Sequence, residues 1–366
     1  MKYLDLFSGY GGFPLGIKQA YEKLCFENKK QPKGSSFGDK EGFYSKQPHY
    51  GSKGFSCVGF SEIDKYAIQV YSKHFNHKNY GDITKINPKD LPDFDLLTGG
   101  FPCQAFSIAG KRRGFEDTRG TLIFSVLRII AEKHPKLVLL ENVKGLLSHD
   151  SGNTFKTIIS SLAELGYAVE WQVLNAKNFG VPQNRERVFI IGHLGGFGGR
   201  QVFPIGAINK MGVGENENEV SSTLTSCYWK GLAGGRQGLI EKTKNVSQGY
   251  RVYDPKGIST TLAGQAGGIG AKTGLYEVEN CKIRKLTPIE CERLMGLPDG
   301  WTAEGMRQSE EHSNMYDLVD ISDTQRYKLC GNGVVVNVVE EIIKRLIKTN
   351  EKRNTSPKRD FKIFKR

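Results

Sequence analysis

The first half of the chain alternates between two hydrophobic periods. Short apolar runs typical of β-strands occur at residues 3–7, 57–63, 95–98, 136–141, 168–174 and 188–194. Between most of them lie segments with the period of amphipathic helices, at residues 13–24, 66–75, 121–134 and 154–165. This alternation predicts an α/β fold, a doubly wound and mostly parallel sheet with helices on both faces. Ligands of such sheets bind at the carboxyl ends of the strands.

The rest of the chain divides into segments of different amino-acid composition. Residues 26–55 are polar and rich in Gly, Lys and Pro, which predicts an inserted surface loop. Residues 195–283 are glycine-rich, with short strand candidates and few helical signals, so we expect a smaller, irregular second domain. Regular structure returns at residue 284. Thr287 and Glu290 form a capping-box pattern, with Pro288 at the first helical position.

An amphipathic helix predicted at residues 335–347 is expected to pack back onto the first domain. The first domain would therefore comprise residues 1–194 and 284–348. Residues 349–366 form a basic tail, for which a solvated end and a DNA-binding arm are both open.

Charge and cysteine content narrow the class of protein. The 366 residues carry a formal net charge of +13, which favours an acidic partner, nucleic acid first, although a basic chain can also be merely soluble. None of the 7 cysteines has C-x-x-C spacing, so we expect reduced thiols, no metal site and a cytoplasmic location. Neither a signal peptide nor a run long enough to span a membrane is recognisable. We expect a monomer.

Two features at predicted strand ends favour a nucleotide-like ligand. The stretch DLFSGYGG, residues 5–12, follows the first strand, and its glycines would let the backbone approach a ligand. Glu62 ends the second strand, where an acid can bind ribose hydroxyls about 20 residues after the glycines. Here the gap is about 50 residues, and removing the predicted loop of about 30 restores that spacing. Asp82, in GDIT, could end a third strand. The alternatives are a tight turn and a loop aspartate.

Chemistry-bearing residues follow the next strands. GGFPCQAFS places Cys103 after a Gly-Gly-Phe-Pro turn, where a thiolate could act as a nucleophile. Glu141 ends the following strand at the same edge, as expected of a proton donor. Arg185 and Arg187, in QNRERVF, would face the same way on a strand and could hold a phosphate or an acidic group. Each residue also has an inert structural reading, but together they indicate a site.

These motifs resemble the DNA cytosine-5 methyltransferase family. DLFSGYGG, GGFPCQAFS, ENVKGLL, QNRERVFIIG, RKLTPIECERLMGLPDGW and YKLCGNGVVVNVV stand in that family's order. The resemblance covers residues 1–194 and 284–347 and implies a Rossmann-like methyltransferase domain. Residues 195–283 fall where the family keeps its variable target-recognition region. The insertion at residues 26–55 is a departure that touches no motif.

The resemblance implies a mechanism that needs no metal. The target cytosine is flipped out of duplex DNA, Cys103 adds to C6 as a thiolate, and Glu141 hydrogen-bonds or protonates N3. C5 then takes the methyl group of S-adenosylmethionine, which leaves S-adenosylhomocysteine, and the C5 proton and Cys103 depart. Arg187 would contact the base or Glu141, with Arg185 nearby.

The resemblance also implies a set of cofactor-binding residues. Glu62 would bind the ribose, Ile63 would lie beside the adenine, and Asp82 and Ile83 would flank it. The full set is Phe7, Gly9, Gly11, Gly12, Glu62, Ile63, Asp82, Ile83, Pro102, Leu122, Asn332 and Val334.

The DNA-binding candidates lie in two regions. The resemblance places Gln104 and Ser107 on a catalytic loop against DNA. In the second domain, the similar segments VSSTLTSCYWKG and GISTTLAGQAGG suggest a loop framework that includes Thr223 and Thr260. Candidates for reading bases there are Lys230, Arg236 and Gln237, since Lys and Arg pair with guanine and Gln with adenine. The alternative is that they contact only phosphate, which such side chains do more often.

Two other functions fit the same fold. An RNA cytosine-5 methyltransferase is disfavoured because such relatives carry a Cys-Phe-Thr element in this region, and none occurs here. A non-catalytic DNA-binding relative is disfavoured because all the proposed chemical residues are present. A cognate restriction endonuclease is a candidate partner, and a cellular and a phage origin are both open.

The division of the chain predicts where sequence specificity resides. Replacing residues 195–283 with the matching region of a relative should redirect methylation to that relative's DNA sequence, because every chemical motif lies outside this stretch. Bisulfite sequencing of DNA from expressing cells would read the methylated sequence directly. An active chimera that keeps the original sequence would place specificity elsewhere.

Overall fold

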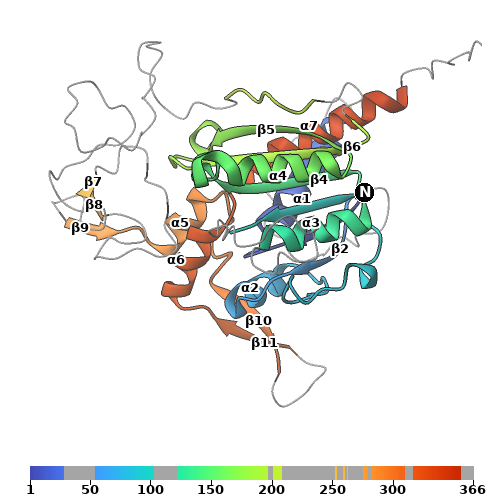
Figure 1. Ribbon diagram of the computed structural model, residues 1–366. Coiled ribbons are helices and arrows are strands. Elements are labelled where there is room, and N and C mark those ends of the chain that lie inside the picture. The colour runs from blue at the N-terminus through green and yellow to red at the C-terminus, as the bar shows by residue number, and fades with distance from the viewer. Residues whose placement is uncertain are drawn as a thin grey trace, which may run out of the picture.

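A six-stranded sheet runs through the middle of the protein (Figure 1). The structure is a computed structural model, and it describes residues 1–28, 54–102, 122–196, 201–207, 252–253, 259, 262, 275–278, 282–309 and 316–355. In spatial order the strands are β2 (Ser56–Ser61), β1 (Lys2–Leu6), β3 (Leu96–Gly100), β4 (Leu137–Val143), β6 (Glu186–Leu194) and β5 (Tyr167–Asn175).

The sheet is mostly parallel, as the alternation predicts. The pairs β1–β2, β1–β3 and β3–β4 are parallel, whereas β6 is antiparallel to both of its neighbours, β4 and β5. Five strands therefore share one direction and β6 alone is reversed. The carboxyl ends of β1 to β4 meet at one edge of the sheet.

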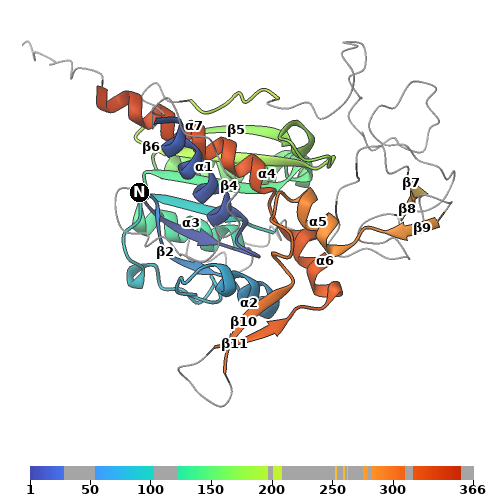
Figure 2. The same ribbon diagram turned by 180° about the vertical axis from the view of Figure 1, so that it is seen from behind.

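Helices cover both faces of the sheet. Figure 1 shows α3 (Leu122–Lys133) and α4 (Asn153–Glu164) on one face, and Figure 2 shows α1 (Gly12–Asn28) and α7 (Val336–Thr355) on the other. The sheet has two cores because successive side chains of a strand point to opposite faces. On β3, Leu96 packs into the α1–α7 core and Leu97 into the α3–α4 core. A fifth helix, α2 (Lys65–His74), lies beside β2.

The C-terminal part of the chain returns to the first domain. It comprises α5 (Pro288–Leu294), the antiparallel hairpin β10 (Glu304–Gln308) and β11 (Tyr316–Asp320), α6 (Asp323–Asn332) and α7. The predicted capping box of α5 is confirmed, because Thr287 and Glu290 make the reciprocal hydrogen bonds. Helix α7 lies against α1 so closely that a Cβ on Gly16 would come 2.7 Å from Val339 Cγ1.

Two predicted segment boundaries are wrong by a few residues. Helix α1 continues to Asn28, so the first residues of the predicted loop at 26–55 are helical. Helix α7 continues to Thr355, so the predicted basic tail at 349–366 begins as helix. In both cases the helix continues past the last residues of its clear hydrophobic period, which is why the period does not mark its end.

Only part of the region 195–283 is described. It contains β7 (Val252–Tyr253), β8 (Leu275–Val278) and the start of β9 (Lys282–Lys285), which form a three-stranded sheet. Val202 and Phe203 are buried in the first domain's core, and their backbone amides donate to the buried carboxylate of Glu170 on β5. The chain therefore stays attached to the first domain past residue 194.

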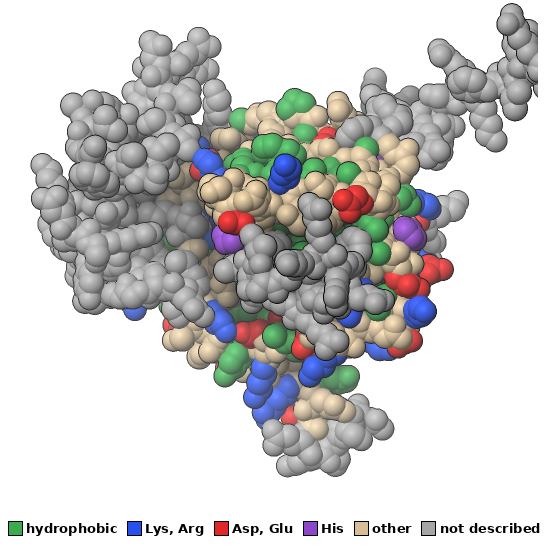
Figure 3. All heavy atoms as spheres, viewed as in Figure 1, with side chains coloured by type: hydrophobic (Ala, Val, Ile, Leu, Met, Phe, Trp, Pro, Cys, Tyr) green, Lys and Arg blue, Asp and Glu red, His purple; other side chains and the backbone are tan. Residues whose placement is uncertain are grey.

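The helix-covered face in Figure 3 carries mixed charge. Among the described side chains visible there, both basic and acidic groups occur. No described helix is long and apolar enough to cross a membrane.

Asp5 on β1 is a buried carboxyl group with one unsatisfied oxygen. Its Oδ1 accepts a hydrogen bond from Thr98 Oγ1 at 2.7 Å, and its Oδ2 has no partner among the described residues. Burial raises its pKa from 3.8 to about 7. The folded state therefore binds this proton more tightly than the unfolded state, and the stability this contributes is lost as the pH rises through about 7.

We predict that Asp5→Asn removes this pH dependence. Between about pH 5.5 and pH 8 the wild type should lose roughly 2 kcal/mol of unfolding free energy relative to the variant. Urea denaturation at the two pH values measures the difference. Asp93→Asn, at an exposed carboxylate, is the control. Parallel pH curves for wild type and Asp5→Asn would contradict the prediction.

Candidate active site

The turn between β1 and α1 has an unusual backbone. Phe7, Gly9 and Gly11 all have positive φ, at 55°, 54° and 87°. Ser8 Oγ donates to the Asp5 carbonyl at 3.1 Å, and the Gly11 amide donates to the Ser8 carbonyl at 2.9 Å. A left-handed Phe is uncommon, and such backbone strain concentrates at functional sites.

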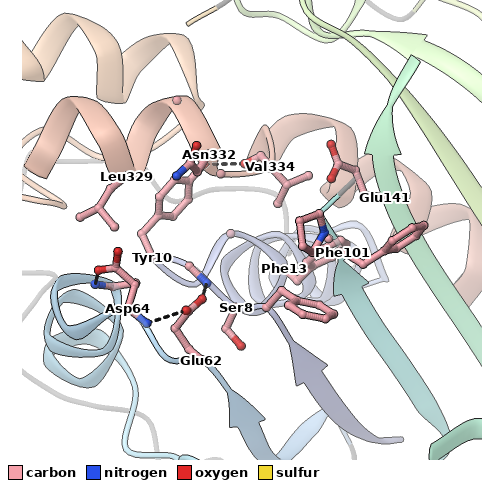
Figure 4. Close-up of a pocket in the computed structure, with 18 of the residues that line it drawn as sticks. Ser8, Tyr10, Phe13, Glu62, Asp64, Phe101, Glu141, Leu329, Asn332 and Val334 are labelled. Carbon is pink, nitrogen blue, oxygen red and sulfur yellow. Dashed lines mark hydrogen bonds between the residues drawn. The ribbon is translucent and has the colours of Figure 1, made fainter. Parts of the chain in front are cut away.

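Glu62 follows β2 directly and lies against this turn. Its Oε2 accepts from the Gly9 amide at 2.9 Å, and its Oε1 accepts from the amides of Ile63 and Asp64 at 2.8 and 2.9 Å. The structure thus brings the glycine-rich turn and the predicted acid together although 53 residues separate Gly9 from Glu62. Figure 4 shows Glu62 beneath the pocket and Glu141 on its other side.

Glu141 and Arg187 form an ion pair at the carboxyl end of β4. Arg187 Nε lies 2.9 Å from Glu141 Oε1, and the two side chains are only 16% and 12% exposed. Burial raises the pKa of Glu141, while Arg187 and Arg185 act in the opposite direction. The predicted contact between an arginine of QNRERVF and an acidic group is therefore present.

Arg185 makes different contacts. It is buried, and its guanidinium donates to three backbone carbonyls, those of Leu262, Gly331 and Gly333, at 3.0, 2.8 and 2.8 Å. Burial, with the nearby Arg187, lowers its pKa to about 9, so the group remains charged at neutral pH. Through these three hydrogen bonds Arg185 connects the segments at residues 262 and 331–333 to the start of the strand that carries Arg187.

Asn142 positions the segment that leads to Cys103. Its Nδ2 donates to the Phe101 carbonyl at 2.9 Å, and its Oδ1 accepts from the Val143 amide at 2.8 Å. Pro102 lines the same pocket as Glu141. Cys103, Gln104 and Ser107 lie outside the described residues, so their roles stay predictions.

The segment after α6 closes the pocket from the far side. Asn332 and Val334 line it, as predicted, and Tyr10 Oη donates to the Val334 carbonyl at 2.6 Å. On the rim, Lys328 Nζ donates to Asp64 Oδ2 at 2.6 Å. Two distant parts of the chain thus meet across the mouth of the pocket.

Together these groups enclose a cavity of about 400 Å³. Ten predicted site residues line it: Phe7, Gly9, Gly12, Glu62, Pro102, Glu141, Arg185, Arg187, Asn332 and Val334. Lining residues absent from the prediction include Ser8, Tyr10, Phe13, Asp64, Asn142, Lys328 and Leu329. Of these, five belong to recognised motifs, so their position in the sequence could have indicated them: Ser8, Tyr10, Asn142, Lys328 and Leu329.

Five predicted cofactor residues lie outside the lining. Gly11 is pressed against Phe75, and the side chain of Ile63 is 73% exposed. Ile83 is buried in the α3–α4 core, and Leu122 packs against the same core. Asp82 ends no strand, because residues 83–85 form a turn in which Asp82 Oδ1 accepts from the amide and hydroxyl of Thr84. The strand end considered for Asp82 is therefore excluded, and the alternative of a loop aspartate is confirmed.

The remaining candidates are not described. Thr223, Lys230, Arg236, Gln237 and Thr260 lie outside the described residues. Within the described part of the chain, no group of three or more His, Cys, Asp or Glu side chains could hold a metal ion.

Comparison with known proteins identifies the family. A family model described as C-5 cytosine-specific DNA methylase matches residues 42–348. The chain is 36% identical over 363 residues to the Type II methyltransferase M.HhaI of Haemophilus parahaemolyticus, covering 93% of each chain. The chain belongs to the C-5 cytosine-specific DNA methylase family. The predicted enzyme class, a DNA (cytosine-5) methyltransferase, is confirmed.

Other relatives agree. The methyltransferase is 38% identical over 359 residues to the Type II methyltransferase M1.ScrFI of Lactococcus lactis subsp. cremoris, covering 96% of this chain and 79% of that protein. Its fold is similar to the crystal structure of S. pombe Dnmt2 methyltransferase, with a TM-score of 0.58 over 95% of this chain and 98% of that one. At 17% identity this likeness shows the fold alone.

The Glu141–Arg187 pair predicts a titration effect in the methyltransferase. Arg187→Gln should raise the pKa of Glu141 further, because it removes the positive charge that favours the carboxylate. Carboxyl ¹³C NMR of labelled glutamate measures this pKa. Lys144→Gln is the control, since Lys144 pairs with Glu186 instead. A Glu141 pKa equal to that of the wild type would show that the pair does not control its ionisation.

Proposed function

We propose that the enzyme transfers a methyl group from S-adenosylmethionine to C5 of a cytosine flipped out of duplex DNA, through a covalent adduct with Cys103. The observation that carries the proposal is the largely buried Glu141–Arg187 pair at a pocket edge that Pro102, the residue before Cys103, also lines. The acid Glu141, the arginine that pairs with it, Arg187, and the residue before the proposed nucleophile therefore line the same pocket.

The pocket residues fit S-adenosylmethionine. A cavity of about 400 Å³ lies within the range typical of small-molecule sites. The positive-φ backbone of Gly9 faces open space and would let a ligand approach the turn closely. Glu62 would accept the ribose hydroxyls, while Phe7, Asn332 and Val334 would enclose the rest of the molecule. Bound S-adenosylmethionine would supply an electrophilic methyl group.

The chain's own residues would perform the remaining chemistry. The Cys103 thiolate would form a bond to C6, which moves an electron pair toward C5. Glu141, whose pKa burial raises, would donate a proton to N3, and Arg187 would hold its carboxyl group in place. Loss of the C5 proton to water, with return of the N3 proton to Glu141, would restore the C5–C6 double bond and expel the Cys103 thiolate.

Duplex DNA is the proposed form of the substrate. The net charge of +13 favours a polyanion, and flipping the base would bring it to the nucleophile. Residues 195–283 would read the surrounding bases. Tyr10, Asn142 and Arg185 would then hold the walls of the site during the reaction.

The nucleophile provides the direct test. Cys103→Ala should lose methyl transfer to duplex DNA at least a thousandfold while still binding the cofactor, because only the wild type can form the C6 bond. DNA containing 5-fluorocytosine should trap the wild type covalently, since fluorine at C5 cannot leave as a proton. Transfer of labelled methyl and denaturing electrophoresis measure the two effects.

Cys25→Ala, at a free thiol on α1, is the matched control and should retain both activities. Appreciable turnover by Cys103→Ala would exclude the covalent mechanism. Methylation of tRNA in preference to duplex DNA would exclude the proposed substrate.

A further inference from the structure

We propose that Tyr10 is a positioning residue that sets the enzyme's affinity for S-adenosylmethionine, by holding the segment after α6 against the glycine-rich turn. The inference rests on the proposed function, in that it takes the pocket to be the cofactor site. The residue lies in the middle of DLFSGYGG, yet it reaches a partner 324 positions away.

The phenol is placed to hold the far wall of the pocket. Tyr10 is 1% exposed, and its hydroxyl donates to the Val334 carbonyl at 2.6 Å (Figure 4). Burial raises its pKa well above the ordinary value, so the hydroxyl keeps its proton at neutral pH. Val334 itself lines the cavity, and its carbonyl is fixed by this bond.

The segment that Tyr10 holds connects two helices. Helix α6 ends at Asn332 and α7 begins at Val336. Arg185 binds the carbonyls of Gly331 and Gly333, so Tyr10 supplies the next carbonyl contact along the segment. The fit is tight, because a Cβ on Gly333 would come 2.0 Å from Tyr10 Cε1.

The other end of Tyr10 is equally constrained. Its backbone carbonyl accepts from Trp301 Nε1 at 3.0 Å, and His74 stacks on Trp301 with ring centroids 3.5 Å apart. The turn therefore cannot easily shift to replace a lost hydroxyl contact. Without it the Val334 carbonyl would be buried and unpaired, and the pocket wall would relax.

A second tyrosine makes the same bond away from the pocket. Tyr167 is 3% exposed, and its hydroxyl donates to the Pro135 carbonyl at 2.6 Å. It packs in the α3–α4 core, and neither partner lines the cavity. Tyr167→Phe therefore repeats the chemical change of Tyr10→Phe with no route to the cofactor.

The experiment compares binding of S-adenosylhomocysteine to the two variants in the absence of DNA. Calorimetry should show affinity about five- to tenfold weaker in Tyr10→Phe and unchanged in Tyr167→Phe, with similar losses of thermal stability in both. In steady-state assays the Tyr10 variant should raise the KM for S-adenosylmethionine more than it lowers kcat. Gly333→Ala, whose added methyl group would crowd the hydroxyl end of the phenol, should also weaken binding.

Equal affinities in wild type and Tyr10→Phe would overturn the inference, as would equal losses in the two Phe variants. A wild type that binds no S-adenosylhomocysteine would instead overturn the proposed function. If Tyr10→Phe does not fold, binding to Gly333→Ala decides, and wild-type affinity there would overturn the inference.

Discussion

The buried guanidinium of Arg185 joins three parts of the chain that are far apart in sequence. It stands at the start of β6 and binds carbonyls after α6 and in the second region. A buried charge is costly unless its donors are used. Here three backbone carbonyls accept hydrogen bonds from Nη1 and Nη2, while Nε has no partner among the described residues. The wall formed by residues 331–334 depends on this contact, and so does the enclosure of the pocket.

The reversed strand gives the site its second half. Because β6 runs antiparallel to β4, Val143 pairs with Arg187 and the start of β6 lies at the carboxyl end of β4. A parallel strand in this place would begin at the opposite edge of the sheet. Reversal therefore brings Arg187 to Glu141, while the parallel strands β1 to β3 bring the glycine-rich turn, Glu62 and Pro102 to the same edge.

Residues at strand ends were the predictable part of the site. Glu62 and Glu141 follow apolar runs, and parallel strands end at a common edge, so their proximity could be inferred without coordinates. Asp82 follows no strand. The short polar segment around it forms a turn, and hydrophobic periodicity does not distinguish such a turn from the end of a strand. The contacts of Lys328 and Tyr10 could not be inferred, although both residues lie in recognised motifs, because their partners, Asp64 and Val334, lie hundreds of residues away.

Local information was enough for the strands and helices of the sheet domain's first 194 residues, for α5 and α7 and for the class of fold, since hydrophobic period and capping act over a few residues. It was also enough for the family, because the chemical motifs are contiguous. It did not predict the β10–β11 hairpin or α6. The pairing of Glu141 with Arg187, the burial of Arg185 and the contact between Tyr10 and Val334 arise only when the sheet and the returning C-terminal segment assemble. They depend on which side chains packing brings within hydrogen-bonding distance, and that is a property of the folded chain as a whole.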